Sequence, residues 1–143
     1  MTREFDSPWK DTLDEFLEPA MELFHPELFA AVDWSLGYET LDAELSEIVR
    51  EAELGPTDAD RLFRVTLRTG ESLRLLIHAE VQSQHDPHLP RRMFVYHYRL
   101  KDRYDVPLVG LTILGDESTT WRPNDYNYGS YGTNVLFQFR MVK

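Results

Sequence analysis

The chain has 143 residues, 42% of them hydrophobic and none of them cysteine, which is typical of one folded domain in a reducing, cytoplasmic setting and excludes disulfides, thiolate zinc sites and cysteine catalysis. The formal net charge is −10, with most acidic residues in the first 60 positions, so tight nonspecific binding to nucleic acid is disfavoured, although residues 61–143 are more basic. No apolar run approaches the roughly 20 residues of a membrane span, and the N-terminus does not resemble a secretory signal.

The N-terminal part of the chain is predicted to begin with an amphipathic helix. Apolar residues recur at spacings of three and four, and the helix is expected to start at Pro8 with Ser7 as its N-cap. Pro19 lies inside this pattern and predicts a kink or a break near it, and His25-Pro26 ends the helix. The apolar positions are Trp9, Leu13, Phe16, Leu17, Ala20, Leu23 and Phe24.

A second helix is predicted over residues 40–52. A short turn at residues 26–29 and a loop at residues 33–38 precede it, and the segment Gly55-Pro56-Thr57-Asp58 ends it. The apolar stripe of this helix consists of Leu41, Leu45, Ile48 and Val49.

Two alternating segments then predict a β-hairpin. Residues 62–68 and 73–82 each place their apolar side chains on one face, and Thr69-Gly70-Glu71 is a turn signal between them. Both apolar sets must lie on the same side, so paired residue numbers must have an even sum. A sum of 140 places Asp60 opposite Glu80, and a sum of 142 places it opposite Gln82. The apolar residues are Phe63, Val65 and Leu67 on the first strand and Leu73, Leu75, Ile77, Ala79 and Val81 on the second.

The remaining chain alternates between helix and strand. After a loop at residues 86–90, residues 91–104 are predicted to be a helix, and the nearly unbroken apolar run 106–114 is predicted to be a central strand buried on both faces. Residues 115–133 are rich in turn residues, and residues 134–142 alternate like a last strand. This order predicts one domain over 1–143, with a helical part (1–55) and a sheet core with a crossover helix (60–143). The expected buried positions are Met93, Val95, Tyr96 and Leu100 in the helix and Val135, Phe137, Phe139 and Met141 in the last strand.

The polar face of the hairpin carries the strongest chemical signal. It holds Asp60, His78, Glu80 and Gln82. Either register brings two carboxylates and an amide within reach of one another, and facing like charges destabilise a hairpin unless a cation neutralises them. Carboxylate oxygens suit Mg²⁺ or Mn²⁺, which can activate water and neutralise a phosphodiester. The competing interpretation is a solvated polar face of an antiparallel sheet.

Several other residues allow a functional and a structural interpretation. Arg91, Arg92 and Arg99 on the following helix are candidates for contacting phosphates, or they form a solvated helix face. A packed, hydrogen-bonded role for His78 is favoured over substrate contact. His85 and His88 are more typical of a surface loop than of a zinc site, and no spacing marks Ser83 as a nucleophile. The aromatic residues Trp121, Tyr126, Tyr128 and Tyr131 could stack on bases, but a structural role is favoured.

As a set, these residues resemble the PD-(D/E)XK nuclease superfamily. Within it, the chain is most similar to the recombination-promoting nuclease / transposase-like branch and its uncharacterised bacterial relatives, over most of its length. The matching segments are Asp33-Trp34-Ser35, Gly37-Tyr38-Glu39, Leu41-Asp42, Glu44-Leu45, Asp60-Arg61-Leu62-Phe63-Arg64-Val65, Ile77-His78-Ala79-Glu80-Val81-Gln82-Ser83-Gln84, Arg91-Arg92-Met93-Phe94-Val95-Tyr96, Tyr98-Arg99, Asp102-Arg103-Tyr104, Ile113-Leu114-Gly115-Asp116 and Trp121-Arg122-Pro123.

The resemblance implies an α/β fold with a restriction-endonuclease-like core (α-β-β-β-α-β), in which helices flank a mixed central sheet. It also implies Mg²⁺- or Mn²⁺-dependent hydrolysis of phosphodiester bonds in DNA. In this assignment Asp60 and Glu80 are metal ligands, and Gln82 takes the position of the superfamily's lysine, where some branches tolerate glutamine. An acid from the preceding helix often completes such a site; Glu44 is the expected residue, with Glu39 and Glu47 as alternatives.

Two classes of function stay open at this point. The first is a metal-dependent DNA endonuclease with Asp60, Glu80 and Gln82 as catalytic residues. The second is a catalytically inactive descendant that keeps the fold as a binding or interaction module; an enzyme acting on a small phosphorylated molecule is a weaker third option. DNA is the expected partner, and a homodimer is one open form of assembly. Members of this branch usually continue into further helices, whereas this chain ends at Lys143, so a shortened form or a remnant gene is one interpretation that stays open.

Overall fold

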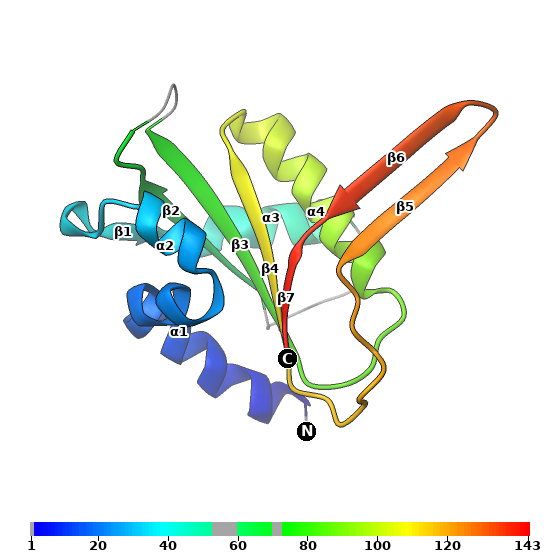
Figure 1. Cartoon of the computed structure of the whole chain (residues 1–143), viewed down its shortest axis with the longest axis horizontal. Helices are drawn as coiled ribbons and strands as arrows, with labels where there is room; N and C mark the ends of the chain where they lie inside the picture. Colours follow the sequence, from blue (N-terminus) through cyan, green and yellow to red (C-terminus); the bar gives the residue numbers. More distant parts are fainter. Residues whose placement is uncertain (1, 53–59, 70–72) are drawn as a thin grey trace.

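A mixed five-stranded sheet with helices against both faces organises the protein (Figure 1). The structure is a computed structural model that describes residues 2–52, 60–69 and 73–143. The strand order is β1-β2-β3-β4-β7; β2 pairs antiparallel with β1 and β3, whereas β4 pairs parallel with β3 and β7. The predicted mixed sheet flanked by helices is therefore confirmed. The strands are β1 (Tyr38–Thr40), β2 (Asp60–Thr66), β3 (Arg74–Gln82), β4 (Leu108–Leu114) and β7 (Arg140–Val142).

The β2–β3 hairpin has the register with paired numbers that sum to 140. Asp60 lies opposite Glu80 and Phe63 lies opposite Ile77. The predicted apolar face is buried, except that Leu73 precedes β3 and is 53% exposed. Of the predicted turn, Gly70 and Glu71 lie outside the described residues. The register fixes which side chains share the polar face of this hairpin.

Helices α1 (Thr2–Phe24) and α2 (Pro26–Ala31) cover the apolar face of the hairpin. The predicted N-cap at Ser7 is wrong, because α1 begins at Thr2 and Ser7 lies inside it. The predicted kink is confirmed at Phe16, whose φ of −127° and ψ of 38° are not helical. Pro19 explains it, since its ring clashes with the carbonyl four residues earlier and removes one hydrogen bond. No helix in the described ranges is long and apolar enough to cross a membrane.

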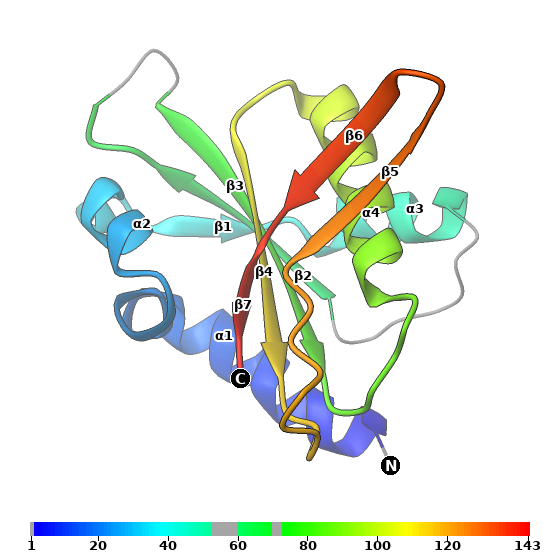
Figure 2. The same ribbon diagram turned by 45° about the vertical axis from the view of Figure 1, so that its right-hand side comes forward.

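Helices α3 (Asp42–Ala52) and α4 (Leu89–Tyr104) lie against the opposite face of the sheet (Figure 2). Leu45 and Ile48 of α3 pack with Tyr96 and Leu100 of α4 over Leu62 of β2. Helix α3 begins two residues later than predicted because Tyr38–Thr40 forms strand β1, which is too short to show alternation. The predicted helix end at residues 55–58 lies outside the described residues.

The C-terminal part contains a second, two-stranded sheet that projects from the body (Figures 1 and 2). Strands β5 (Asp125–Ser130) and β6 (Thr133–Gln138) form a hairpin around Tyr131 and Gly132, whose φ values of 50° and 86° suit a two-residue turn. The prediction of one strand over 134–142 is wrong, because the chain passes from β6 to β7 at Phe139. The alternation of apolar residues in this segment indicates which side chains are buried, not which strand they pair with. Phe137 and Phe139 are buried in one cluster, although β6 pairs with β5 and β7 pairs with β4.

Candidate active site beneath helix α4

The two predicted carboxylates face each other inside the protein. Asp60 is the first residue of β2, and its Cα partner on β3 is Glu80. Asp60 is 5% exposed and Glu80 is fully buried. His78, two residues before Glu80 on the same face, is 1% exposed. The alternative interpretation as a solvated polar face is therefore wrong; this face is a buried polar cluster.

Helix α4 buries the cluster because it crosses back over the sheet between β3 and the parallel strand β4. Arg92 and Tyr96 are four residues apart and so lie on the same side of this helix. The Tyr96 ring packs edge-on against His78, with 5.8 Å between ring centroids. Tyr96 has no exposed surface, so the helix excludes solvent from the two carboxylates.

Arg92 supplies the cation that the facing carboxylates require. Its Nε and Nη2 donate to Oε1 of Glu80 at 3.0 and 2.5 Å, and its Nη1 donates to Oδ2 of Asp86 at 2.8 Å. Its Nη2 also lies 3.4 Å from Oε1 of Gln82. The Arg92 side chain is 12% exposed, so these charge-assisted contacts are largely shielded from water.

Arg92 does not provide hydrogen bonds for all the carboxylate oxygens of the cluster. Oδ1 and Oδ2 of Asp60 and Oε2 of Glu80 are buried, and none of the described residues donates a hydrogen bond to them. Nε2 of His78 lies 3.7 Å from Oδ2 of Asp60, and neither ring nitrogen of His78 has a hydrogen-bond partner among the described residues. The predicted packing of His78 is therefore confirmed, but its predicted hydrogen bonding is wrong. A buried carboxylate oxygen without a partner is costly, so three such atoms at one point favour a cation or ordered water there.

The electrostatics of the cluster are dominated by burial. Burial and the repulsion of Asp60 raise the pKa of Glu80 to about 8, although Arg92 acts in the opposite direction. Burial and the same two carboxylates raise the pKa of the Tyr96 hydroxyl. Burial acts to lower the pKa of Arg92, but Glu80 and Asp86 outweigh it and the net shift is upward, so Arg92 stays charged. Glu80 is thus close to a protonation change at neutral pH.

The other predicted residues are divided between this cluster and the surface. Gln82 lies at the end of β3, and its Nε2 donates to the Gln84 carbonyl at 2.9 Å. Arg91 is exposed at the start of α4, and Arg99 lies 4.0 Å from Glu51 of α3. The structure therefore brings Gln82 and Arg92 to the pair but places Arg99 with α3.

The expected third acid is not part of the cluster. Glu44 is half-buried on α3, where its charge raises the pKa of Tyr104 at the far end of α4, an effect that is smaller than that of burial. Glu39 pairs with Arg64 at 2.6 Å, and Glu47 pairs with Arg103 at 2.9 Å. Nowhere in the described ranges do three or more His, Asp or Glu side chains form a group that could hold an ion.

The residues present still fit Mg²⁺ or Mn²⁺. Magnesium is commonly held by one or two carboxylates and completes its coordination with water and substrate phosphate. Asp60 and Glu80 provide two carboxylates and three oxygens without hydrogen-bond partners among the described residues. A metal bound there would supply Lewis-acid chemistry, polarising a phosphate oxygen and acidifying water.

The aromatic and histidine candidates have mainly structural surroundings. Trp121 and Tyr126 pack against a C-terminal core cluster, and the ring of His85 lies tilted at 45° against that of Trp121, with 4.6 Å between ring centroids. Tyr128 contacts Phe94 and is half exposed. Tyr131, at the tip of the β5–β6 hairpin, is fully exposed. The structural interpretation is therefore confirmed for Trp121 and Tyr126.

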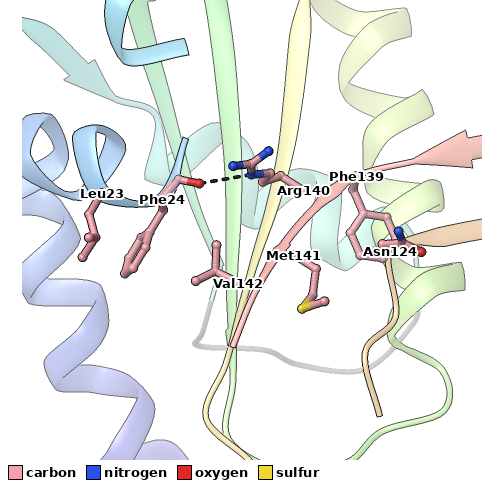
Figure 3. A pocket seen from close by; sticks show the side chains of 7 residues that line it. All are labelled: Leu23, Phe24, Asn124, Phe139, Arg140, Met141 and Val142. Atoms are coloured by element: carbon pink, nitrogen blue, oxygen red, sulfur yellow. Dashed lines mark hydrogen bonds between the residues drawn. The ribbon is translucent and has the colours of Figure 1, made fainter. Parts of the chain in front are cut away.

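Two pockets differ in their relation to the cluster. One, of about 260 Å³, is lined by Asp86, His88, Arg91 and Arg92 at the start of α4 and so borders the cluster through Arg92. The other, of about 480 Å³, lies between the end of α1 and strand β7 (Figure 3). There Nε of Arg140 donates to the Phe24 carbonyl, and none of the described lining residues is an acid. The smaller pocket is the one related to the carboxylates.

Sequence reasoning missed two members of the cluster. The sequence pattern places Asp86 only in a loop and Tyr96 only among the buried positions of the helix. The spacing from Arg92 to Tyr96 places both on one helix face, which is a usable signal. The contact from Arg92 to Asp86 leaves no pattern in the sequence, because the loop that carries Asp86 has no regular repeat.

No protein-family model, no curated protein and no solved structure matches the chain. The chemistry of the site is therefore inferred from its own residues.

Proposed function

We propose that this protein is a metal-dependent phosphodiester hydrolase of the PD-(D/E)XK type that acts as a DNA endonuclease. Asp60 and Glu80 hold Mg²⁺ or Mn²⁺, and Gln82 orients water or phosphate by hydrogen bonding. The observation that carries the proposal is the buried, facing Asp60–Glu80 pair with three unpartnered oxygens. Supporting context comes from the antiparallel β2–β3 hairpin and the crossover through α4 to the parallel strand β4.

The energetics favour a functional origin for the pair. Like charges directly opposite each other destabilise a sheet, and burial increases the effect. The raised pKa of Glu80 expresses this penalty. Residues that lower the stability of the folded state in this way are typical of functional sites, where activity requires groups that are unfavourable for stability.

The test is divalent-metal-dependent cleavage of plasmid DNA by the wild-type chain, Asp60→Asn and Glu80→Gln. Both substitutions remove a metal ligand but also remove like-charge repulsion, so we expect folded proteins without activity. Asp102→Asn, the same chemical change at an exposed position of α4, is the matched control and should cleave like wild type. Wild-type cleavage that survives Asp60→Asn and Glu80→Gln, or no metal-dependent cleavage at all, contradicts the proposal.

A second candidate function is a catalytically inactive binding module with the same fold. The observation that favours it is the Arg92–Glu80 ion pair, which occupies one oxygen of a fully buried carboxylate. This function predicts no cleavage by the wild-type chain and none by Gln82→Lys. Gain of cleavage in Gln82→Lys instead indicates a competent metal site that lacks only a correctly placed cation.

A further inference from the structure

Arg92 links helix α4, strand β3 and the loop between them, next to the Asp60–Glu80 pair. Through one guanidinium it contacts Glu80 and Gln82 at the end of β3 and Asp86 in the loop before α4. Proline at the second position of α4 and the packing of Met93 and Tyr96 fix the first turns of this helix. The turn of α4 that carries Arg92 is therefore fixed by packing, and its guanidinium is held by ion pairs.

The amide of Gln82 is neutral, yet a full positive charge lies beside it. The distance from Nη2 of Arg92 to Oε1 of Gln82 is 3.4 Å. Arginine remains charged at every practical pH, and its fork offers donors in fixed directions. The neutral side chain of Gln82 at the end of β3 is thus next to a permanent positive charge, the guanidinium of Arg92 on α4.

Arg92 also lines a pocket. Arg92 lines the pocket of about 260 Å³ together with Arg91, His88 and Asp86. One side chain therefore contacts both the buried Glu80 and the pocket. Nη1 of Arg92 has a second N–H beside the one that it donates to Asp86, so a phosphate in this pocket would meet a cation that is fixed in place and has one donor left.

We propose that Arg92 is the phosphate-stabilising cation of this site, in the role that Gln82 cannot fill, and that Asp86 is a positioning residue that holds it. This inference rests on the proposed hydrolase function. It assigns Arg92 a role different from that of the surface arginines Arg91 and Arg99, because Arg92 alone of the three contacts Glu80 among the described residues.

In the hydrolysis step, a water oxygen forms a bond to phosphorus, and the bond from phosphorus to one sugar oxygen breaks. The water loses one proton to solvent, and the departing oxygen takes up one proton from solvent, so the products are a phosphomonoester and an alcohol. Negative charge grows on the phosphate oxygens before the bond breaks. A fixed donor aimed at that charge acts without reorganisation, and removal of one such donor typically lowers kcat by about 100- to 1,000-fold.

The experiment compares Arg92→Gln with wild type in two measurements. The first is kcat for a duplex oligonucleotide at saturating Mn²⁺; the second is Mn²⁺ affinity by calorimetry without DNA. We expect kcat to fall by about 100-fold or more. We expect Mn²⁺ to bind more tightly, because a competing cation next to Glu80 is gone. A merely structural role of Arg92 predicts instead that both properties worsen together.

Two further variants serve as a control and as a second test of the role of Arg92. Arg103→Gln removes another α4 arginine that pairs with an acid, Glu47, and should change neither measurement more than twofold. If Arg92→Gln does not fold, Asp86→Asn tests the same role, because it leaves the charge of Arg92 in place and weakens the ion pair that holds it. We expect kcat to fall at least tenfold while Mn²⁺ affinity stays within about twofold of wild type, and an unchanged kcat overturns the role.

The outcomes separate this inference from the proposed function. Wild-type cleavage that depends on Asp60 and Glu80 but is unchanged in Arg92→Gln overturns only the role of Arg92. A parallel loss of kcat and Mn²⁺ affinity in a folded Arg92→Gln also overturns it. Absence of metal-dependent cleavage by wild type overturns both. Lower kcat with tighter Mn²⁺ binding supports both.

Discussion

Replacing Glu80 with glutamine should change how the stability of the protein depends on pH. Burial and the repulsion of Asp60 raise the pKa of Glu80 from 4.5 to about 8. A carboxyl with a raised pKa in the folded state binds a proton more tightly there than in the unfolded chain. Its contribution to stability is therefore fully present below pH 4.5 and is lost as pH rises through about 8. Glutamine mimics the protonated form and has no such loss.

The size of the effect follows from the shift. Each pKa unit corresponds to about 1.4 kcal/mol, so the full displacement is worth about 5 kcal/mol. About 4 kcal/mol of this falls between pH 5 and pH 8.5, because the loss is already under way at pH 5. From pH 5 to pH 8.5, the free energy of unfolding of Glu80→Gln should therefore rise by about 4 kcal/mol relative to that of the wild-type protein.

Urea unfolding at pH 5, 6.5 and 8.5, followed by circular dichroism, measures this difference. The comparison cancels the histidines and other acids that both proteins share. Glu117→Gln, the same change at an exposed position, is the control and should track wild type at every pH. A wild-type minus Glu80→Gln difference that stays constant with pH would refute the assignment of Glu80 as a buried, charge-penalised carboxyl.

Three further substitutions test the fold by urea unfolding at one pH. Leu111→Ala removes a fully buried side chain from β4, an interior strand of the sheet, and should lower the free energy of unfolding by about 2–5 kcal/mol; a loss below about 1 kcal/mol would contradict its burial. Tyr131→Asn should raise that free energy by about 0.5–1 kcal/mol, since asparagine tolerates positive φ better before Gly132, and a loss would argue against this turn. Glu39→Gln breaks an exposed pair with Arg64 and should cost less than about 1 kcal/mol; a larger loss would mean that the pair is shielded from solvent.

The sequence predicts much of this fold because its periodic segments are long. The alternation around Phe63 and Ile77 predicts both the faces and the even register of the hairpin, and the structure has one of the two registers expected from it. Strand β1 is missed because three residues show no period, and β5 because tyrosine and glycine dominate it. Strand β1 pairs with β2 on the far side of helix α3 in the sequence, which a local pattern does not report, whereas β5 pairs with its neighbour β6 in a hairpin.

The candidate site divides in the same way. Asp60 and Glu80 are adjacent as predicted, because strand parity and register alone place them. Their burial beneath α4 and the pairing of Arg92 with Asp86 depend on how a helix packs on the sheet. Glu44 fails to join them because α3 directs it toward the far end of α4. Packing between elements, rather than pattern within them, determines these contacts.

The most direct test of the proposed metal site is a crystal of the protein soaked in Mn²⁺ and measured for anomalous scattering. The account predicts an anomalous peak in contact with the carboxylates of Asp60 and Glu80, and its disappearance in Asp60→Asn. A fully soaked crystal with no peak at this pair, and with the Arg92–Glu80 ion pair unchanged, would contradict it.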